Sequence, residues 1–156
     1  MDVVTLRLGG ELMAIPAECL REILEPVPVT RVPQAGNFIG GLINVRGVVV
    51  PLADLRVTFG MTLTEATPDT RMLVLELPIA GDEIVVAILA DKVHDVTGLD
   101  PSTLEPIPPV GTRWPPDFVR GIGKWQGGFM ILPDLERIFT QGAQKGSLSA
   151  VAEEGV

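Results

Sequence analysis

The chain has 156 residues, 46% of them hydrophobic, and a net charge of −8, which is enough material for one domain with a sizeable core. Its 12 Lys and Arg residues form no run, so a nucleic acid partner is disfavoured, because counterion release needs clustered cations. Cys19 is the single cysteine, which excludes an intramolecular disulfide. With no signal-peptide pattern and apolar runs far below the roughly 20 residues of a membrane span, we expect a cytoplasmic protein.

The amino-terminal segment predicts a β-hairpin. Apolar residues alternate with polar ones over residues 4–8, a Gly-Gly pair follows, and residues 12–15 are again apolar. Pro16 is suited to begin a short helical turn. For residues 20–24 the pattern permits either a helix or a strand.

The stretch 38–60 carries the strongest local signals of the chain. Two β-branched runs, 40–45 and 48–52, flank Arg46-Gly47, and glycine tolerates the positive φ of a tight turn. This pattern predicts a hairpin with Arg46 at its tip, followed by an end-of-strand turn in which Asp54 stands between apolar anchors. The prolines of residues 25–36, just before it, predict an ordered loop.

The next part of the chain predicts another hairpin and a departing strand. Residues 61–70 are polar and predict a loop that connects the two duplicated halves. Residues 71–77 and 83–90 are β-rich and joined by a turn, and the unbroken apolar run 84–89 indicates burial on both faces. Residues 91–97 mix apolar and charged side chains, as a strand leaving the core does.

The carboxyl-terminal part predicts a proline-rich loop over 101–116, a hairpin over 119–132 and a helix. The helix begins near Pro133, because Leu135, Ile138 and Phe139 have helical spacing. Residues 142–156 lack periodicity and predict a mobile tail.

An internal duplication connects the two hairpins. Shifting the chain by 80 positions lays residues 24–59 over 104–139 with 11 identical pairs, where composition predicts about two. At the tips, Asn44-Val45-Arg46 faces Lys124-Trp125-Gln126, so we look for function in Arg46. The duplication predicts an approximate division into subdomains 1–66 and 67–141, with strand exchange between them left open, ahead of the tail.

The predicted fold class is all-β. Many short strands separated by Gly and Pro turns indicate this class, and the duplication indicates two small barrels. Closure of each barrel would remove edges that such apolar strands cannot safely expose.

Residues 41–56, GLINVRGVVVPLADLR, resemble the signature of CheW-type coupling domains: an N-x-R-G hairpin followed by a P-x-x-D-L-R turn. The resemblance extends over about residues 4–139. It implies two intertwined five-stranded SH3-like barrels with no catalytic activity. It also implies two partners, the cytoplasmic tips of chemoreceptors and the regulatory domain of a CheA-type histidine kinase, assembled in rings beneath the membrane.

The resemblance also implies site residues. The receptor-facing groove corresponds to Leu20, Glu22, Ile23, Arg46, Val48 and Val96. Kinase contacts correspond to the loop before the signature, at Phe38, Ile39 and Gly40.

Each of these residues also has a simpler interpretation. An arginine at a turn tip is commonly a solvated cation, and Leu20, Ile23, Val48 and Val96 are each the kind of residue that fills a core. The duplicated Asp54 and Asp134 are expected to accept backbone hydrogen bonds at strand ends rather than to act as acids.

The sequence gives little support to the hypothesis of an enzyme or of a metal site. Cys19 and His94 lack a third orienting group, and one Cys with one His does not supply a metal site, so we predict no cofactor and no metal. The leading hypothesis, which the resemblance implies, is an adaptor in chemotaxis. An adaptor in a chemosensory-like pathway for surface motility, development or second-messenger output is the alternative, and an enzyme using Cys19 or the paired aspartates is the third.

Overall fold

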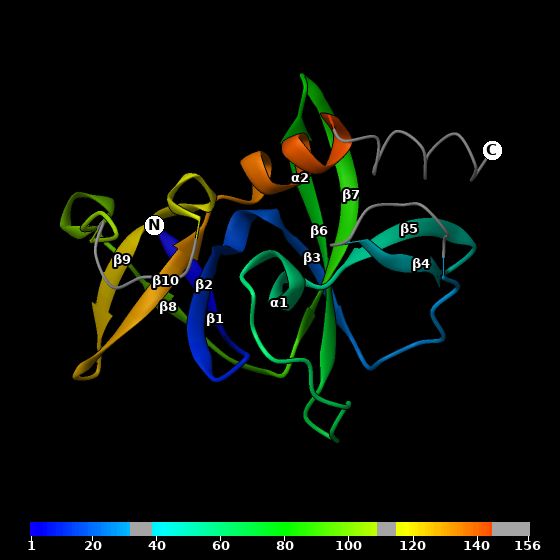
Figure 1. Cartoon of the computed structure of the whole chain (residues 1–156), viewed down its shortest axis with the longest axis horizontal. Coiled ribbons are helices and arrows are strands. Elements are labelled where there is room, and N and C mark those ends of the chain that lie inside the picture. Colours follow the sequence, from blue (N-terminus) through cyan, green and yellow to red (C-terminus); the bar gives the residue numbers. More distant parts are fainter. Residues whose placement is uncertain (32–38, 109–114, 145–156) are drawn as a thin grey trace.

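The computed structural model describes residues 1–31, 39–108 and 115–144, and its strands form two five-stranded sheets that lie side by side (Figure 1). The strands are β1 (Asp2–Leu8), β2 (Glu11–Pro16), β3 (Leu20–Leu24), β4 (Ile39–Val45), β5 (Val48–Ala53), β6 (Arg71–Ile79), β7 (Asp82–Ala90), β8 (Lys92–Gly98), β9 (Val119–Trp125) and β10 (Gly128–Pro133). Two α-helices, α1 (Leu55–Thr58) and α2 (Leu135–Gln144), and three 3-10 turns, η1 (Ala17–Cys19), η2 (Pro101–Thr103) and η3 (Pro116–Phe118), connect them.

The two sheets exchange strands along the chain. One has the order β3-β6-β7-β5-β4 and is called the central barrel; the other has the order β8-β1-β2-β10-β9 and is called the terminal barrel. The terminal barrel therefore combines the two ends of the chain, and neither sheet is formed by 1–66 or 67–141 alone. A parallel pairing joins the distant segments in each case, β2 with β10 and β5 with β7.

Each sheet is closed by a short bridge between its two edges. After β3, Thr30 pairs with Leu42 of β4 through hydrogen bonds of 2.9 and 2.8 Å. After β8, Glu105 pairs with Ile122 of β9 through bonds of 3.0 and 2.7 Å. Leu42 and Ile122 are 80 positions apart, so the duplication extends to the way in which the edges meet. The predicted pair of five-stranded barrels is confirmed.

The two duplicated hairpins have the same construction. β4 pairs with β5, and β9 with β10, in registers that correspond under the 80-residue shift. Both turns place two residues at positive φ, Arg46 (50°) and Gly47 (83°) in one, and Gln126 (47°) and Gly127 (77°) in the other. Arg46 lies at a hairpin tip, as predicted.

Other secondary-structure predictions are confirmed with changes in detail. The opening hairpin and the turn after Pro16 form, and residues 20–24, left open between helix and strand, are β3. The turn between β6 and β7 is tighter than predicted, because both strands continue to the Ala80-Gly81 pair. A short helix, α1, replaces the predicted end-of-strand turn, and α2 ends at Gln144, inside the segment expected to be tail.

One burial prediction is wrong. The run 84–89 was expected to be buried on both faces, but Val85 is 37% exposed. Val85 and Glu83 lie on the same face of β7, where the β6–β7 hairpin projects beyond the body of the molecule (Figure 1). Buried neighbours cover this face only farther along the strand.

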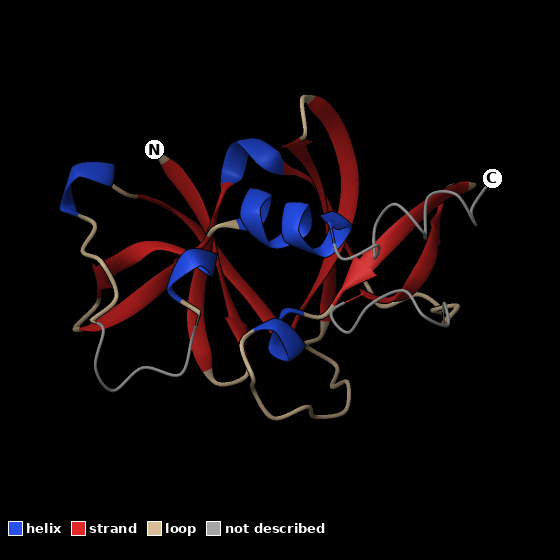
Figure 2. Cartoon of the chain, turned by 45° about the horizontal axis from the view of Figure 1, so that its top comes forward, coloured by secondary structure: helices blue, strands red, loops and turns tan. Residues whose placement is uncertain are grey.

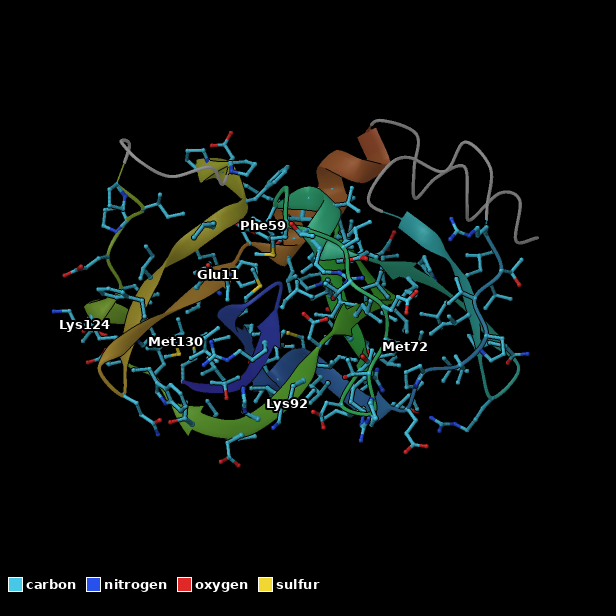
Figure 3. All side chains as sticks on the ribbon, turned by 60° about the horizontal axis from the view of Figure 1, so that its bottom comes forward. Glu11, Phe59, Met72, Lys92, Lys124 and Met130 are labelled. Carbon is cyan, nitrogen blue, oxygen red and sulfur yellow. The ribbon has the colours of Figure 1, made fainter. Side chains whose placement is uncertain are left out.

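The largest hydrophobic cluster unites the two barrels. It combines Leu6 and Ile15 of the terminal barrel with Leu73 and Ile88 of the central barrel. The duplicated Phe59 and Phe139 lie in the same cluster, and Figure 3 shows Phe59 between the two groups of strands. α2 packs on β6 across the same junction (Figure 2). In the part of the chain that the structure describes, no helix is long and apolar enough to span a membrane.

Candidate functional site

The β4–β5 turn is stabilised by residues of the turn itself. Asn44 Oδ1 accepts a hydrogen bond of 2.7 Å from the Gly47 backbone N–H, which fixes the turn. Arg46 occupies the left-handed region that non-glycine residues rarely adopt. The N-x-R-G motif therefore stabilises the turn. Its asparagine accepts a backbone hydrogen bond, its glycine adopts positive φ, and its arginine projects from the apex.

The Arg46 side chain is directed by Glu22 of β3. Arg46 Nη1 donates to Glu22 Oε1 at 3.1 Å, and Nη2 donates to Glu22 Oε2, which completes a bidentate ion pair. The hydrogen bonds to Glu22 raise the pKa of Arg46 above its usual value. The arginine side chain remains 76% exposed. It is therefore oriented by one carboxylate while the rest of its fork faces solvent.

Three of the four predicted apolar site residues are exposed rather than part of the core. Ile23 of β3 is 44% exposed, Val48 of β5 is 59% exposed, and Val96 of β8 is 62% exposed. Leu20 differs, since it is half-buried and packs against the large core cluster. The core interpretation therefore holds in part for Leu20 and fails for the other three.

The structure brings some of the predicted residues together and separates others. Arg46 and Glu22 touch, Ile23 is next to Glu22 on β3, and Val48 follows the turn that presents Arg46. Val96 comes from the terminal barrel, where it pairs with Val4 of β1. The candidate receptor site is thus centred on the central barrel, with Val96 as a contribution from the other sheet.

A shallow apolar hollow beside the tip was missed by the sequence analysis. It has a volume of about 310 Å³ and is lined by Val27, Pro28, Thr30, Leu42, Ile43, Asn44 and Val49. Val49 is 54% exposed and lies on the opposite face of β5 from Val48. The sequence held an indication of this hollow. Successive side chains of a strand point to opposite faces, so the adjacent valines at the start of β5 cannot both face the core.

The predicted kinase-contact residues are only partly within the described chain. Phe38 lies outside the described residues. Ile39 and Gly40 form the first two positions of β4, with the Ile39 backbone opposite Ala53 of β5. Their role stays a prediction.

The duplicated aspartates are helix caps. Asp54 Oδ1 accepts from the Arg56 N–H at 3.0 Å, and Asp134 Oδ1 accepts from the Arg137 N–H at 3.1 Å. Asp54 also binds the buried Arg56 guanidinium through bonds of 2.9 and 2.7 Å. This confirms the predicted structural role and leaves neither carboxylate in the position of a catalytic acid.

Cys19 is not set up as a nucleophile. Its Sγ lies 3.1 Å from the Pro16 carbonyl oxygen, and burial raises the pKa of the Cys19 thiol, which lowers the reactive thiolate fraction. His94 lies on an exposed part of β8. The described residues hold no cluster of three or more side chains suited to a metal ion.

Comparison with known proteins decides the family. The profile of the CheW-like domain matches residues 2–143. The chain belongs to the CheW-like domain family. This places the two barrels, the Arg46 hairpin and the capped α1 turn within one known architecture.

Individual CheW-like proteins resemble the chain over most of its length. The chemotaxis protein CheW of Klebsiella aerogenes is 32% identical over 139 residues, covering 89% of this chain and 81% of that protein. The chemotaxis protein CheW of Helicobacter pylori is 32% identical over 131 residues, covering 84% and 76%. The crystal structure of the scaffolding protein TtCheW from Thermoanaerobacter tengcongensis superposes with a TM-score of 0.78 at 32% identity, covering 88% of this chain and 86% of that one. The family places this CheW-like chain among adaptor and scaffolding proteins of chemotaxis rather than among enzymes.

Proposed function

We propose that this chain is an adaptor that couples the cytoplasmic tips of chemoreceptors to the regulatory domain of a CheA-type histidine kinase. The observation that carries this proposal is the Arg46 site: Glu22 orients an exposed guanidinium, and the exposed Ile23 and Val48 lie on the strands next to it, β3 and β5. None of these side chains is needed to fill the core. They are available to a partner.

The chemistry of the site suits a helical receptor tip. Exposed aliphatic side chains supply contact area worth about 25 cal/mol per Å² before the costs of association are subtracted. The outward N–H groups of Arg46 suit a carboxylate or helix carbonyl groups, which would fix the register of a bound helix. Val96, on the terminal barrel, would extend the contact to a second sheet.

The proposed cellular setting follows from these partners. The chain would act in the cytoplasm, recruited to membrane-associated receptor arrays rather than inserted in the bilayer. Affinity at one small site is modest, and an array recovers it through multivalency. The adaptor would transmit a shift in the conformational balance of the kinase while changing little itself. We assign the kinase contact to Phe38, Ile39 and Gly40 as part of this proposal.

The proposal is tested by binding of a purified receptor cytoplasmic fragment to Arg46→Ala. We expect a loss of at least about tenfold in affinity, because an oriented arginine at the centre of an interface is commonly a dominant contact. Arg137→Ala is the matched control, since Arg137 is also exposed and ion-paired but lies on α2. Unchanged binding by a folded Arg46→Ala protein would reject the site.

A further inference from the structure

The tip of the β9–β10 hairpin exposes an aromatic side chain that the core does not use. Phe129 is 63% exposed, whereas the other described aromatic residues are buried or half-buried: Phe59, Phe118, Trp125 and Phe139. Under the 80-residue shift Phe129 takes the place of Val49 on the first hairpin. The same turn geometry therefore presents a larger apolar group at the second tip.

The second tip is supported from behind. Trp125 packs against the cluster that contains Met130 and Leu99 in the terminal barrel. Gly123 lies in close contact with this cluster, since a Cβ there would be 3.3 Å from Leu99 Cδ1. Phe129 lies on the other face of the hairpin, directly across from Lys124. Packing fixes the strands without Phe129, so its side chain is free to meet a partner.

The tip also differs from the first one in charge. The cation of the first tip, Arg46, is paired with Glu22, and Gln126 replaces it here with an uncharged side chain. Lys124 is exposed and has no ion pair among the described residues, on a chain whose net charge is −8. Figure 3 places Lys124 at the outer end of the terminal barrel. An unpaired cation beside an exposed phenylalanine suits a carboxylate next to an aliphatic side chain.

We propose that this second hairpin tip is a docking site for an acidic, apolar segment of a protein partner, separate from the Arg46 site. A hollow of about 340 Å³, lined by residues 124–129, receives the aliphatic side chain. Phe129 supplies the apolar contact and Lys124 the charge. An anionic membrane surface is the weaker occupant, because recognition of anionic lipids uses a cluster of cations and residues 124–129 supply only Lys124.

The test is an NMR titration of the isotope-labelled full chain with a blocked ten-residue peptide of alternating Glu and Leu. Amide shifts are expected to concentrate at residues 124–129. Phe129→Ser is expected to lower the affinity at least about fivefold, and Lys124→Gln about two- to threefold, while Lys124→Arg retains it. Leu63→Ser is the matched control, because Leu63 is 58% exposed at a different place and its loss is expected to change nothing.

The proposal would be overturned if millimolar peptide caused no amide shifts at residues 124–129, or if a Lys/Leu peptide bound equally well. It would also be overturned if a folded Phe129→Ser protein bound the peptide with unchanged affinity. Binding of residues 124–129 to phosphatidylglycerol vesicles instead of the peptide would overturn it as well. Receptor-fragment binding is measured in parallel. Phe129→Ser is expected to preserve it, and its loss would show that the tip is not a separate site. Failure of the Arg46 proposal would instead appear in Arg46→Ala alone.

Discussion

Arg46 at the apex of the β4–β5 hairpin and Glu22 on β3 form a bidentate ion pair that connects the two edges of the central barrel. The Thr30–Leu42 bridge joins the same two edges farther from the tip. The strand that carries Leu20, Glu22 and Ile23 is therefore tied to the turn that presents Arg46. The central-barrel part of the candidate receptor site is therefore connected across the two edges rather than carried by an isolated loop.

Reversing this pair separates its orienting role from its binding role. In the double variant Glu22→Arg with Arg46→Glu, the ion pair is retained but the charge at the tip is inverted. We expect a folded protein whose hydrogen exchange at β3 matches the wild type and whose receptor-fragment binding is lost, because the exposed group no longer suits a carboxylate or helix carbonyl. Restored binding in the double variant would mean that Arg46 acts only by holding the hairpin to β3.

Arg56 is expected to be a major stabilising residue of the junction between the barrels. Its guanidinium contacts Asp54, the Thr64 carbonyl at 3.0 Å and Asp91, whose other oxygen accepts the Gly9 N–H at 2.8 Å. Arg56→Met leaves two carboxylates without their cation and is expected to cost about 2–4 kcal/mol in urea unfolding.

The matched control for Arg56 is Arg137→Met. Arg137 lies three residues after the second capping aspartate, Asp134, and is ion-paired with it, but the Arg137 side chain is 60% exposed. We expect a change below about 1 kcal/mol, because exposed ion pairs contribute little. Equal losses for the two variants would contradict the assigned role of Arg56.

Closure of the central barrel is expected to depend on Gly41. A Cβ there would lie 2.3 Å from the Thr30 carbonyl oxygen, whereas at the duplicated Gly121 it would lie 3.1 Å from Leu104 Cβ. Gly41→Ala is expected to lower the free energy of unfolding by about 2–4 kcal/mol, and Gly121→Ala by about 1 kcal/mol. Urea unfolding checks the order, and a larger loss at Gly121 would refute this account of closure.

The Cys19 thiol is expected to react slowly. Burial raises the pKa of Cys19, so at a given pH less thiolate is present than in a free cysteine, and the alkylation rate rises only at higher pH. Iodoacetamide labelling across a pH series measures this midpoint, with free cysteine as the reference. A midpoint below that of free cysteine would support the activated nucleophile that the structure argues against.

Local features of the fold were predictable where one residue type has one physical use. Gly47 and the flanking valines predicted the hairpin with Arg46 at its tip, and the duplicated Asp54 and Asp134 predicted carboxylates that accept backbone hydrogen bonds, because these choices depend only on neighbouring residues. The 80-residue shift predicted two similar barrels. The resemblance supplied the intertwined architecture and the site residues.

Long-range features were less accessible. The exchange that puts β2 beside β10 depends on a parallel contact between Met13 and Ile131, which no local pattern encodes. The pairing of Arg46 with Glu22 spans 24 positions and also requires the folded barrel. Val85 was assigned to the interior from its apolar neighbours, but the projection of the β6–β7 hairpin exposes it.

The most direct test of the adaptor account is light scattering on a size-exclusion column with the chain, a receptor cytoplasmic fragment and the regulatory domain of a CheA-type kinase. The account predicts a ternary complex that contains all three, and predicts that Arg46→Ala releases the receptor fragment while the kinase domain stays bound. Mutually exclusive binding of the two partners, or binding of neither, would contradict it.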